Sequence, residues 1–110
     1  MAEQFSVVWS ELAAADLDAI IDHVAAEAPQ AAERLLDALE RRAASLETLP
    51  RRGRIVPELT RLHIREYREL IHGPYRVMYA VRGRRVDVLA LIDARRDLQS
   101  LILERLLGGR

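Results

Sequence analysis

The sequence contains no cysteine among its 110 residues, and all 17 of its basic residues are arginine. Without cysteine, a disulfide framework and a thiolate metal site are excluded, and nothing favours an oxidising compartment. No stretch approaches the roughly 18 apolar residues of a membrane-spanning helix, and the N-terminus lacks the basic start and apolar run of a signal peptide. We therefore expect a cytoplasmic protein with no membrane-bound part.

The motifs of common nucleotide and metal chemistry are missing too. The chain has no glycine-rich phosphate loop, no HExxH and no GxSxG. His23, His63 and His72 are far apart in the sequence, with no close pair at metal-ligand spacing. The sequence thus predicts neither a metal site nor a cofactor.

What the chain does have is enough apolar residues for one core. Half of its residues are hydrophobic and 31% are charged, which is typical of a globular protein. A length of 110 residues fits a single domain, and we assign residues 1–110 to it, with 97–110 as a C-terminal helical extension.

The charge is unevenly distributed along the chain. Residues 1–49 carry 3 arginines and 10 acidic residues, a net charge of −7, whereas residues 50–110 carry 14 arginines and 7 acidic residues, a net charge of +7. Arginine suits bidentate contacts with phosphate or carboxylate. Two interpretations remain open: a solvated basic sheet edge, or a surface for an anionic partner such as nucleic acid or an acidic protein segment.

The first half of the chain predicts a strand followed by a helical hairpin. The run at 5–9, FSVVW, favours a strand, and Ser10 is typical of a helix N-cap. A second helix is predicted from Pro29, which suits a first helical turn, to Pro50, which ends it. The apolar residues of the first helix recur at spacings of three and four, and we place Asp16, Asp18 and Asp22 largely away from that face; the apolar positions are Ala13, Leu17, Ile20, Ile21, Val24 and Ala28.

The second half predicts an antiparallel meander. Residues 50–61 are expected to form a basic loop, 62–71 a weak strand, and 75–82 and 85–93 two clear strands joined by a glycine-containing turn. Alternation places Val77, Tyr79 and Val81 on one face of the first clear strand and Met78 and Ala80 on the other. In the second, it places Val86, Val88, Ala90 and Ile92 on one face and Leu89 and Leu91 on the other.

Both faces of this sheet are apolar, so each needs a cover. The helical hairpin covers one face. A helix after Asp97 is a candidate for the other, and it has three possible partners: its own sheet, a second copy of the chain, or another protein. The predicted fold class is α+β: strand, helical hairpin, three-stranded antiparallel meander and C-terminal helix.

Three segments, PRRGRIVPEL, RELIHGPYRVMYAV and VLALIDARRDL, resemble the RelE/ParE superfamily, the toxic halves of bacterial type II toxin–antitoxin pairs. The resemblance runs from about Val7 to Leu98. It implies a RelE/ParE-like fold, growth arrest and plasmid stabilisation as biological effects, and neutralisation by a cognate antitoxin.

Nuclease members of this superfamily use arginines at the position matching Arg76 and near Arg96 to stabilise charge on the scissile phosphate of messenger RNA. Antiparallel pairing would bring Arg76, Arg95 and Arg96 to one end of the sheet. We therefore predict a target- or anion-binding site at Arg54, Arg65, Arg76, Arg95 and Arg96. The alternative is that Arg76 pairs with a carboxylate such as Asp87 or Asp93 across the hairpin.

The sequence departs from the nuclease pattern in its proton-transfer residues. No Tyr or His follows Tyr79, and Asp93 stands where many family sequences have His. Glu58 and Glu69 remain as candidate bases, and the nuclease alternative would use Arg76, Arg96 and Glu69. The resemblance therefore favours the ParE-like branch, whose members bind and stall DNA gyrase. The alternatives are a ribosome-dependent messenger RNA endonuclease and a catalytically inert binding module.

The expected partners are a cognate antitoxin and, as target, DNA gyrase or the ribosome. Homodimers or heterotetramers with the antitoxin are possible. The antitoxin is expected to dock on the apolar sheet face and tail helix; the predicted contact residues are Met78, Leu89, Leu91, Leu98, Leu101 and Ile102.

Overall fold

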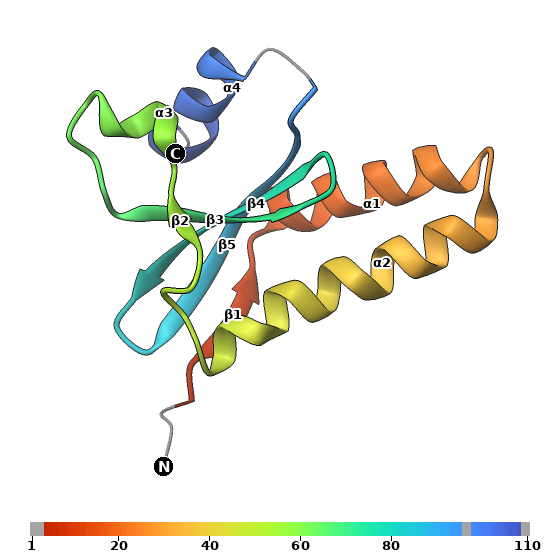
Figure 1. Ribbon diagram of the computed structural model, residues 1–110, viewed down its shortest axis with the longest axis horizontal. Coiled ribbons are helices and arrows are strands. Elements are labelled where there is room, and N and C mark those ends of the chain that lie inside the picture. The colour runs from red at the N-terminus through yellow and green to blue at the C-terminus, as the bar shows by residue number, and fades with distance from the viewer. Residues whose placement is uncertain (1–3, 96–97, 109–110) are drawn as a thin grey trace.

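The computed structural model describes residues 4–95 and 98–108. It is an α+β fold in which one sheet lies between two helical layers (Figure 1). In chain order the elements are β1 (Ser6–Trp9), α1 (Glu11–Ala25), α2 (Pro29–Ala44), the 3₁₀ turn η1 (Ser45–Glu47), β2 (Arg54–Ile55), α3 (Pro57–Thr60), β3 (Tyr67–His72), β4 (Tyr75–Arg82), β5 (Arg85–Asp93), α4 (Gln99–Leu103) and the π-helical turn η2 (Glu104–Gly108). None of the helices formed by these residues is long and apolar enough to cross a membrane.

The helical hairpin forms as predicted. The Ser10 hydroxyl accepts a hydrogen bond from the Ala13 N–H at 3.1 Å, which caps α1, and Pro29 occupies the first turn of α2. Regular α-helix ends at Ala44, and a 3₁₀ turn carries the chain on toward Pro50.

The five strands lie in the order β1-β5-β4-β3-β2. β1 runs parallel to β5, and the other neighbours are antiparallel. β1 pairs only with the first half of β5, from Ser6 opposite Arg85 to Trp9 opposite Val88, because the chain turns into α1 after Ser10. Beyond Val88, no strand formed by the described residues covers this side of β5.

The prediction for residues 50–71 was partly wrong. The expected loop contains β2, which pairs with Arg68 and Glu69 of β3, and the short helix α3. The expected strand begins only at Tyr67. Pro57 supplies the fixed φ of a first helical turn, and His63 adopts a positive φ of 60°, so the chain cannot run straight through this segment.

Each face of the sheet carries its own core. On the hairpin side the buried residues include Leu17, Leu39, Leu46, Leu70, Val77, Tyr79, Val86, Val88 and Leu91. On the opposite side they are Val56, Leu59, Tyr67, Met78, Ala80, Ala90, Ile92, Ile102 and Leu106. The C-terminal helix thus folds back on its own sheet, one of the three arrangements that the sequence left open (Figure 1).

The predicted faces hold for β4 but not for all of β5. Tyr79 lies opposite Val88, whereas Met78 lies opposite Ala90, so Leu89 is an extra residue in a β-bulge. Side-chain alternation shifts at that point. Ala90 and Ile92 consequently face α4 rather than joining Val86 and Val88 against the hairpin.

Gly53 lies where no side chain fits. Its N–H donates to the Tyr79 hydroxyl at 2.9 Å, and a Cβ at this position would meet the Glu69 carbonyl oxygen at 2.5 Å and the Tyr79 hydroxyl at 2.7 Å. The first of these atoms is backbone of a paired strand. The loop before β2 can therefore approach β3 and β4 this closely only at a glycine.

Replacing Gly53 with alanine should lower the free energy of unfolding by about 1–3 kcal/mol, because backbone must move to admit the methyl group. Urea unfolding followed by circular dichroism measures the change. Gly108→Ala is the control, since a Cβ there meets nothing closer than 3.9 Å. Equal stability of the two variants would contradict this account of the loop.

Candidate functional site

Arg76, a predicted anion-binding residue, is held by two carboxylates. Its side chain is 5% exposed. Its Nε donates to Glu69 Oε1 at 2.6 Å and its Nη2 to Glu69 Oε2 at 3.0 Å. On the other side of the guanidinium, Nη1 and Nη2 donate to the two oxygens of Glu58 at 2.8 and 2.7 Å. Every nitrogen of the Arg76 guanidinium therefore contacts a carboxylate.

A second arginine completes this network. The Glu69 side chain is fully buried, and it also accepts from Arg54 Nε at 2.6 Å. The four residues come from β2, α3, β3 and β4, so the network joins the edge of the sheet to the helix that covers it. Two positive and two negative charges balance one another, which is how a buried charge is accommodated.

The pKa shifts agree with this geometry. Hydrogen bonds from Arg76 lower the pKa of the Glu58 carboxyl below its ordinary value of 4.5, against the opposing effect of burial. The hydrogen bonds to Glu58 and Glu69 in turn raise the pKa of Arg76. Both groups thus remain charged through the physiological range.

Arg76 pairs with carboxylates, as the alternative interpretation predicted, but the prediction that these would be Asp87 or Asp93 was wrong. Asp87 pairs with Arg82 and Arg85, because the register places it opposite Ala80 at the far end of β4. Asp93 pairs with Arg95.

The predicted arginines do not form one cluster. Arg54 and Arg76 meet through Glu69. Arg95 is 69% exposed and pairs with Asp93, beside Ala19 and His23 of α1, on the hairpin side of the sheet. Arg65 is exposed in the connection from α3 to β3, and Arg96 lies outside the described residues.

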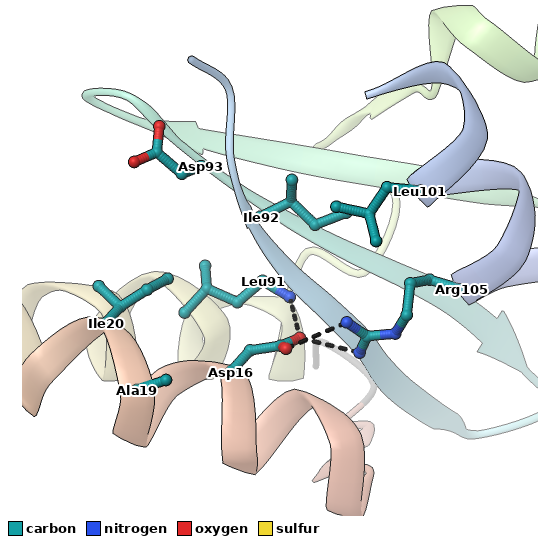
Figure 2. Close-up of a pocket in the computed structure, with 8 residues that line it drawn as sticks. All are labelled: Asp16, Ala19, Ile20, Leu91, Ile92, Asp93, Leu101 and Arg105. Carbon is teal, nitrogen blue, oxygen red and sulfur yellow. Dashed lines mark hydrogen bonds and ion pairs between the residues drawn. The ribbon is translucent and has the colours of Figure 1, made fainter. Parts of the chain in front are cut away.

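A groove runs along the part of β5 that β1 leaves uncovered. We call it the β5 groove; it has a volume of about 180 Å³ and is lined by Asp16, Ala19, Ile20, Leu91, Ile92, Asp93, Leu101 and Arg105 (Figure 2). Its walls are α1 on one side and the C-terminal helical segment on the other. The last backbone hydrogen bond from the β1 segment to β5 runs from the Ser10 N–H to the Val88 carbonyl oxygen, at 2.9 Å.

Side chains satisfy the β5 backbone inside this groove. Asp16 Oδ2 accepts from the Leu91 N–H at 2.9 Å, and Arg105 Nη2 donates to the Leu89 carbonyl oxygen at 2.9 Å. Arg105 and Asp16 also form a salt bridge, with Nη1 to Oδ1 at 3.0 Å (Figure 2). One carboxylate and one guanidinium thus occupy the places of the acceptor and donor that a neighbouring strand would supply.

Neither Asp16 nor Arg105 was predicted as a site residue. Asp16 was placed largely away from the apolar face, yet it is three residues after Ala13 and four before Ile20, so it lies beside that face. An acidic residue next to an apolar stripe was the available signal. No comparable signal marks Arg105 in the sequence, because its partners, Asp16 and the Leu89 carbonyl oxygen, come from distant segments.

The predicted antitoxin-contact residues divide into two groups. Met78 and Ile102 are fully buried, and Leu91 is 3% exposed, all within the chain's own cores. Leu89, Leu98 and Leu101 are half-buried around the second core, and Leu101 lines the β5 groove. Among the described residues, no group of His, Asp or Glu side chains is arranged to hold a metal ion.

The lowered pKa of Glu58 makes stability depend on pH. The stabilisation is fully present above the ordinary value of 4.5 and is lost as pH falls through the lower pKa of the folded state. Glu58→Gln should therefore cost about 1–3 kcal/mol at neutral pH and flatten the acid limb of a plot of unfolding free energy against pH. The control is Glu66→Gln, because Glu66 is an exposed carboxylate in the connection from α3 to β3. An unchanged acid limb in Glu58→Gln would show that the Arg76 contact has no such role.

Comparison with known proteins places the chain in a family. The family model described as the ParE toxin of the type II toxin–antitoxin system, parDE, matches residues 7–98. No curated protein matches. Among solved structures, a chain from the chromosomal ParDE toxin–antitoxin system of P. aeruginosa aligns with a TM-score of 0.68 and 25% identity, covering 82% of this chain and 96% of that chain. The family model spans most of the chain, and the chain therefore belongs to the ParE toxin family of type II toxin–antitoxin systems.

Proposed function

We propose that this ParE-family toxin arrests growth by binding DNA gyrase, without catalysing a reaction itself. The observation that carries the proposal is the state of Arg76. In a nuclease this guanidinium would have to meet the phosphoryl oxygens of the transition state. Here it is buried, and Glu58 and Glu69 occupy two of its hydrogen-bonding edges, so that all three nitrogens already donate to carboxylates.

Freeing Arg76 for a phosphate would be costly. Breaking a buried ion pair by removing one partner typically costs about 3–5 kcal/mol, because the other charge is left uncompensated. Here Glu58 and the fully buried Glu69 would lose their shared partner together. Glu69 is also a poor general base in this arrangement, since both of its oxygens already accept from arginines.

The purified chain should inhibit DNA supercoiling by gyrase and leave ribosome-bound messenger RNA intact. In cells its induction should trigger the DNA damage response before transcripts are lost. The measurements are an agarose-gel supercoiling assay and primer extension on a translated transcript. Cleavage of that transcript would overturn the proposal in favour of the nuclease alternative, and growth without any defect would favour an inert binding module.

We propose further that the cognate antitoxin docks in the β5 groove. An extended segment laid along residues 89–93 would continue the line of β1, and its backbone would take over the bonds that Asp16 and Arg105 now make. Ile20 and Leu101 offer apolar contact beside the strand. This is a form of β-augmentation, in which main-chain bonds give affinity and the flanking side chains give specificity.

Ala19 allows a direct test, because it lines the groove but is exposed and outside both cores. Ala19→Trp should fill the groove and prevent neutralisation by the protein encoded in the adjacent reading frame of the operon, while the chain stays folded. Ala14→Trp, an exposed position on another side of α1, should leave neutralisation intact. Growth rescue on co-expression and affinity co-purification measure both. Full neutralisation of Ala19→Trp would exclude this docking site.

A further inference from the structure

A second concavity lies between the C-terminal part of α2, the end of β3 and the loop that leads to β2. We call it the α2 cleft; it has a volume of about 330 Å³ and is lined by Ala38, Arg41, Arg42, Ser45, Arg52 and His72. None of these residues belongs to the Arg76 network or to the β5 groove. Three of the six are arginines, and no acidic residue lines the cleft.

Hydrogen bonds to backbone fix the walls of the cleft. Arg42 Nη2 donates to the Ile71 carbonyl oxygen at 2.6 Å, which joins α2 to the end of β3. Arg68 Nη1 donates to the carbonyl oxygens of Arg51 and Gly53, at 3.3 and 2.8 Å, which holds the loop that carries Arg52. The backbone that forms the cleft is therefore held in place before a ligand enters it.

Ion pairs cancel the positive charge of the cleft only in part. Asp37 pairs with Arg41 along α2. Arg52 is exposed, and neither it nor Arg42 forms a salt bridge within the described residues. The Nε of Arg42 is buried without a hydrogen-bond partner. Like charges gathered in a concavity raise the local potential and attract an anion.

The lining distinguishes between two classes of anionic partner. An acidic peptide normally anchors apolar side chains in the centre of its interface, and in this cleft only Ala38 offers an apolar side chain. A nucleic-acid backbone needs no such anchor, because contacts between phosphates and arginine side chains supply most of its non-specific affinity. No Phe, Tyr or Trp lines the cleft, so the large rings on which unpaired bases stack are absent, and His72 is the aromatic ring in the lining.

We propose that the α2 cleft binds the phosphate backbone of double-stranded DNA without regard to sequence. This goes beyond the proposed action on gyrase, since it gives the toxin a contact of its own with the DNA on which that enzyme works. It also leaves the β5 groove free, because the two sites share no lining residue. DNA binding at the α2 cleft can therefore be tested independently of gyrase inhibition and of antitoxin docking.

The test is a fluorescence-anisotropy titration of a labelled duplex of about 20 base pairs, of mixed sequence, at several salt concentrations. Arg41→Ala/Arg52→Ala should weaken binding by about tenfold or more at low salt, and should reduce the slope of log affinity against log salt by about two. Both side chains are exposed, so the fold should be kept, and thermal unfolding checks this.

Arg34→Ala/Arg61→Ala is the matched control, because it removes the same charge from exposed positions outside the cleft. It should keep most of the affinity and the salt slope. Equal weakening in both double variants would show general attraction to a basic protein and overturn the site. Absence of duplex binding by the unaltered chain would overturn it as well, as would displacement of the duplex by polyglutamate at a lower concentration than by unlabelled duplex.

Discussion

Along one side of β5, a neighbouring strand pairs with only the first half of its backbone. β1 accompanies β5 only as far as Val88, because Ser10 caps a helix in place of extending the strand. The bulge at Leu89 follows at once, and it turns Ala90 and Ile92 toward the C-terminal helix. The C-terminal helix therefore packs on the apolar face of the same part of β5, beyond Val88, whose outer backbone groups need hydrogen-bond partners.

Asp16 and Arg105 meet this need from opposite sides. One comes from the first helix and the other from the last helical segment, and their salt bridge closes the open edge between them. Side chains can rotate away from a strand edge, whereas a paired strand must be peeled off. The edge is thus protected from chance association in the free chain. In the proposed docking of the antitoxin, an extended segment would bind the same backbone groups that Asp16 and Arg105 protect.

The features that follow from local pattern could be predicted from the sequence. Helical periodicity and the positions of Ser10 and Pro29 sufficed for the hairpin, and β-branched runs sufficed for β4 and β5. A two-residue strand such as β2 has no period to detect, and the bulge depends on how β5 meets its neighbours. The partners of Arg76 could not be found either, because Glu58 and Glu69 approach it only after α3 and β3 are in place.

All basic residues of the chain are arginines, and this choice affects which contacts a basic side chain can make. A guanidinium can contact two carboxylates at once through its planar fork, as Arg76 does, or a carboxylate and a carbonyl, as Arg105 does. A compact ammonium group could not reproduce either geometry. Several arginines of the second half pair with carboxylates of that same half, so its net charge of +7 already counts these pairs. The Arg105–Asp16 pair differs, because its carboxylate comes from the first half. The unbalanced charge of the α2 cleft therefore comes from Arg42 of the acidic half and Arg52 of the basic half, because Arg41 there pairs with Asp37.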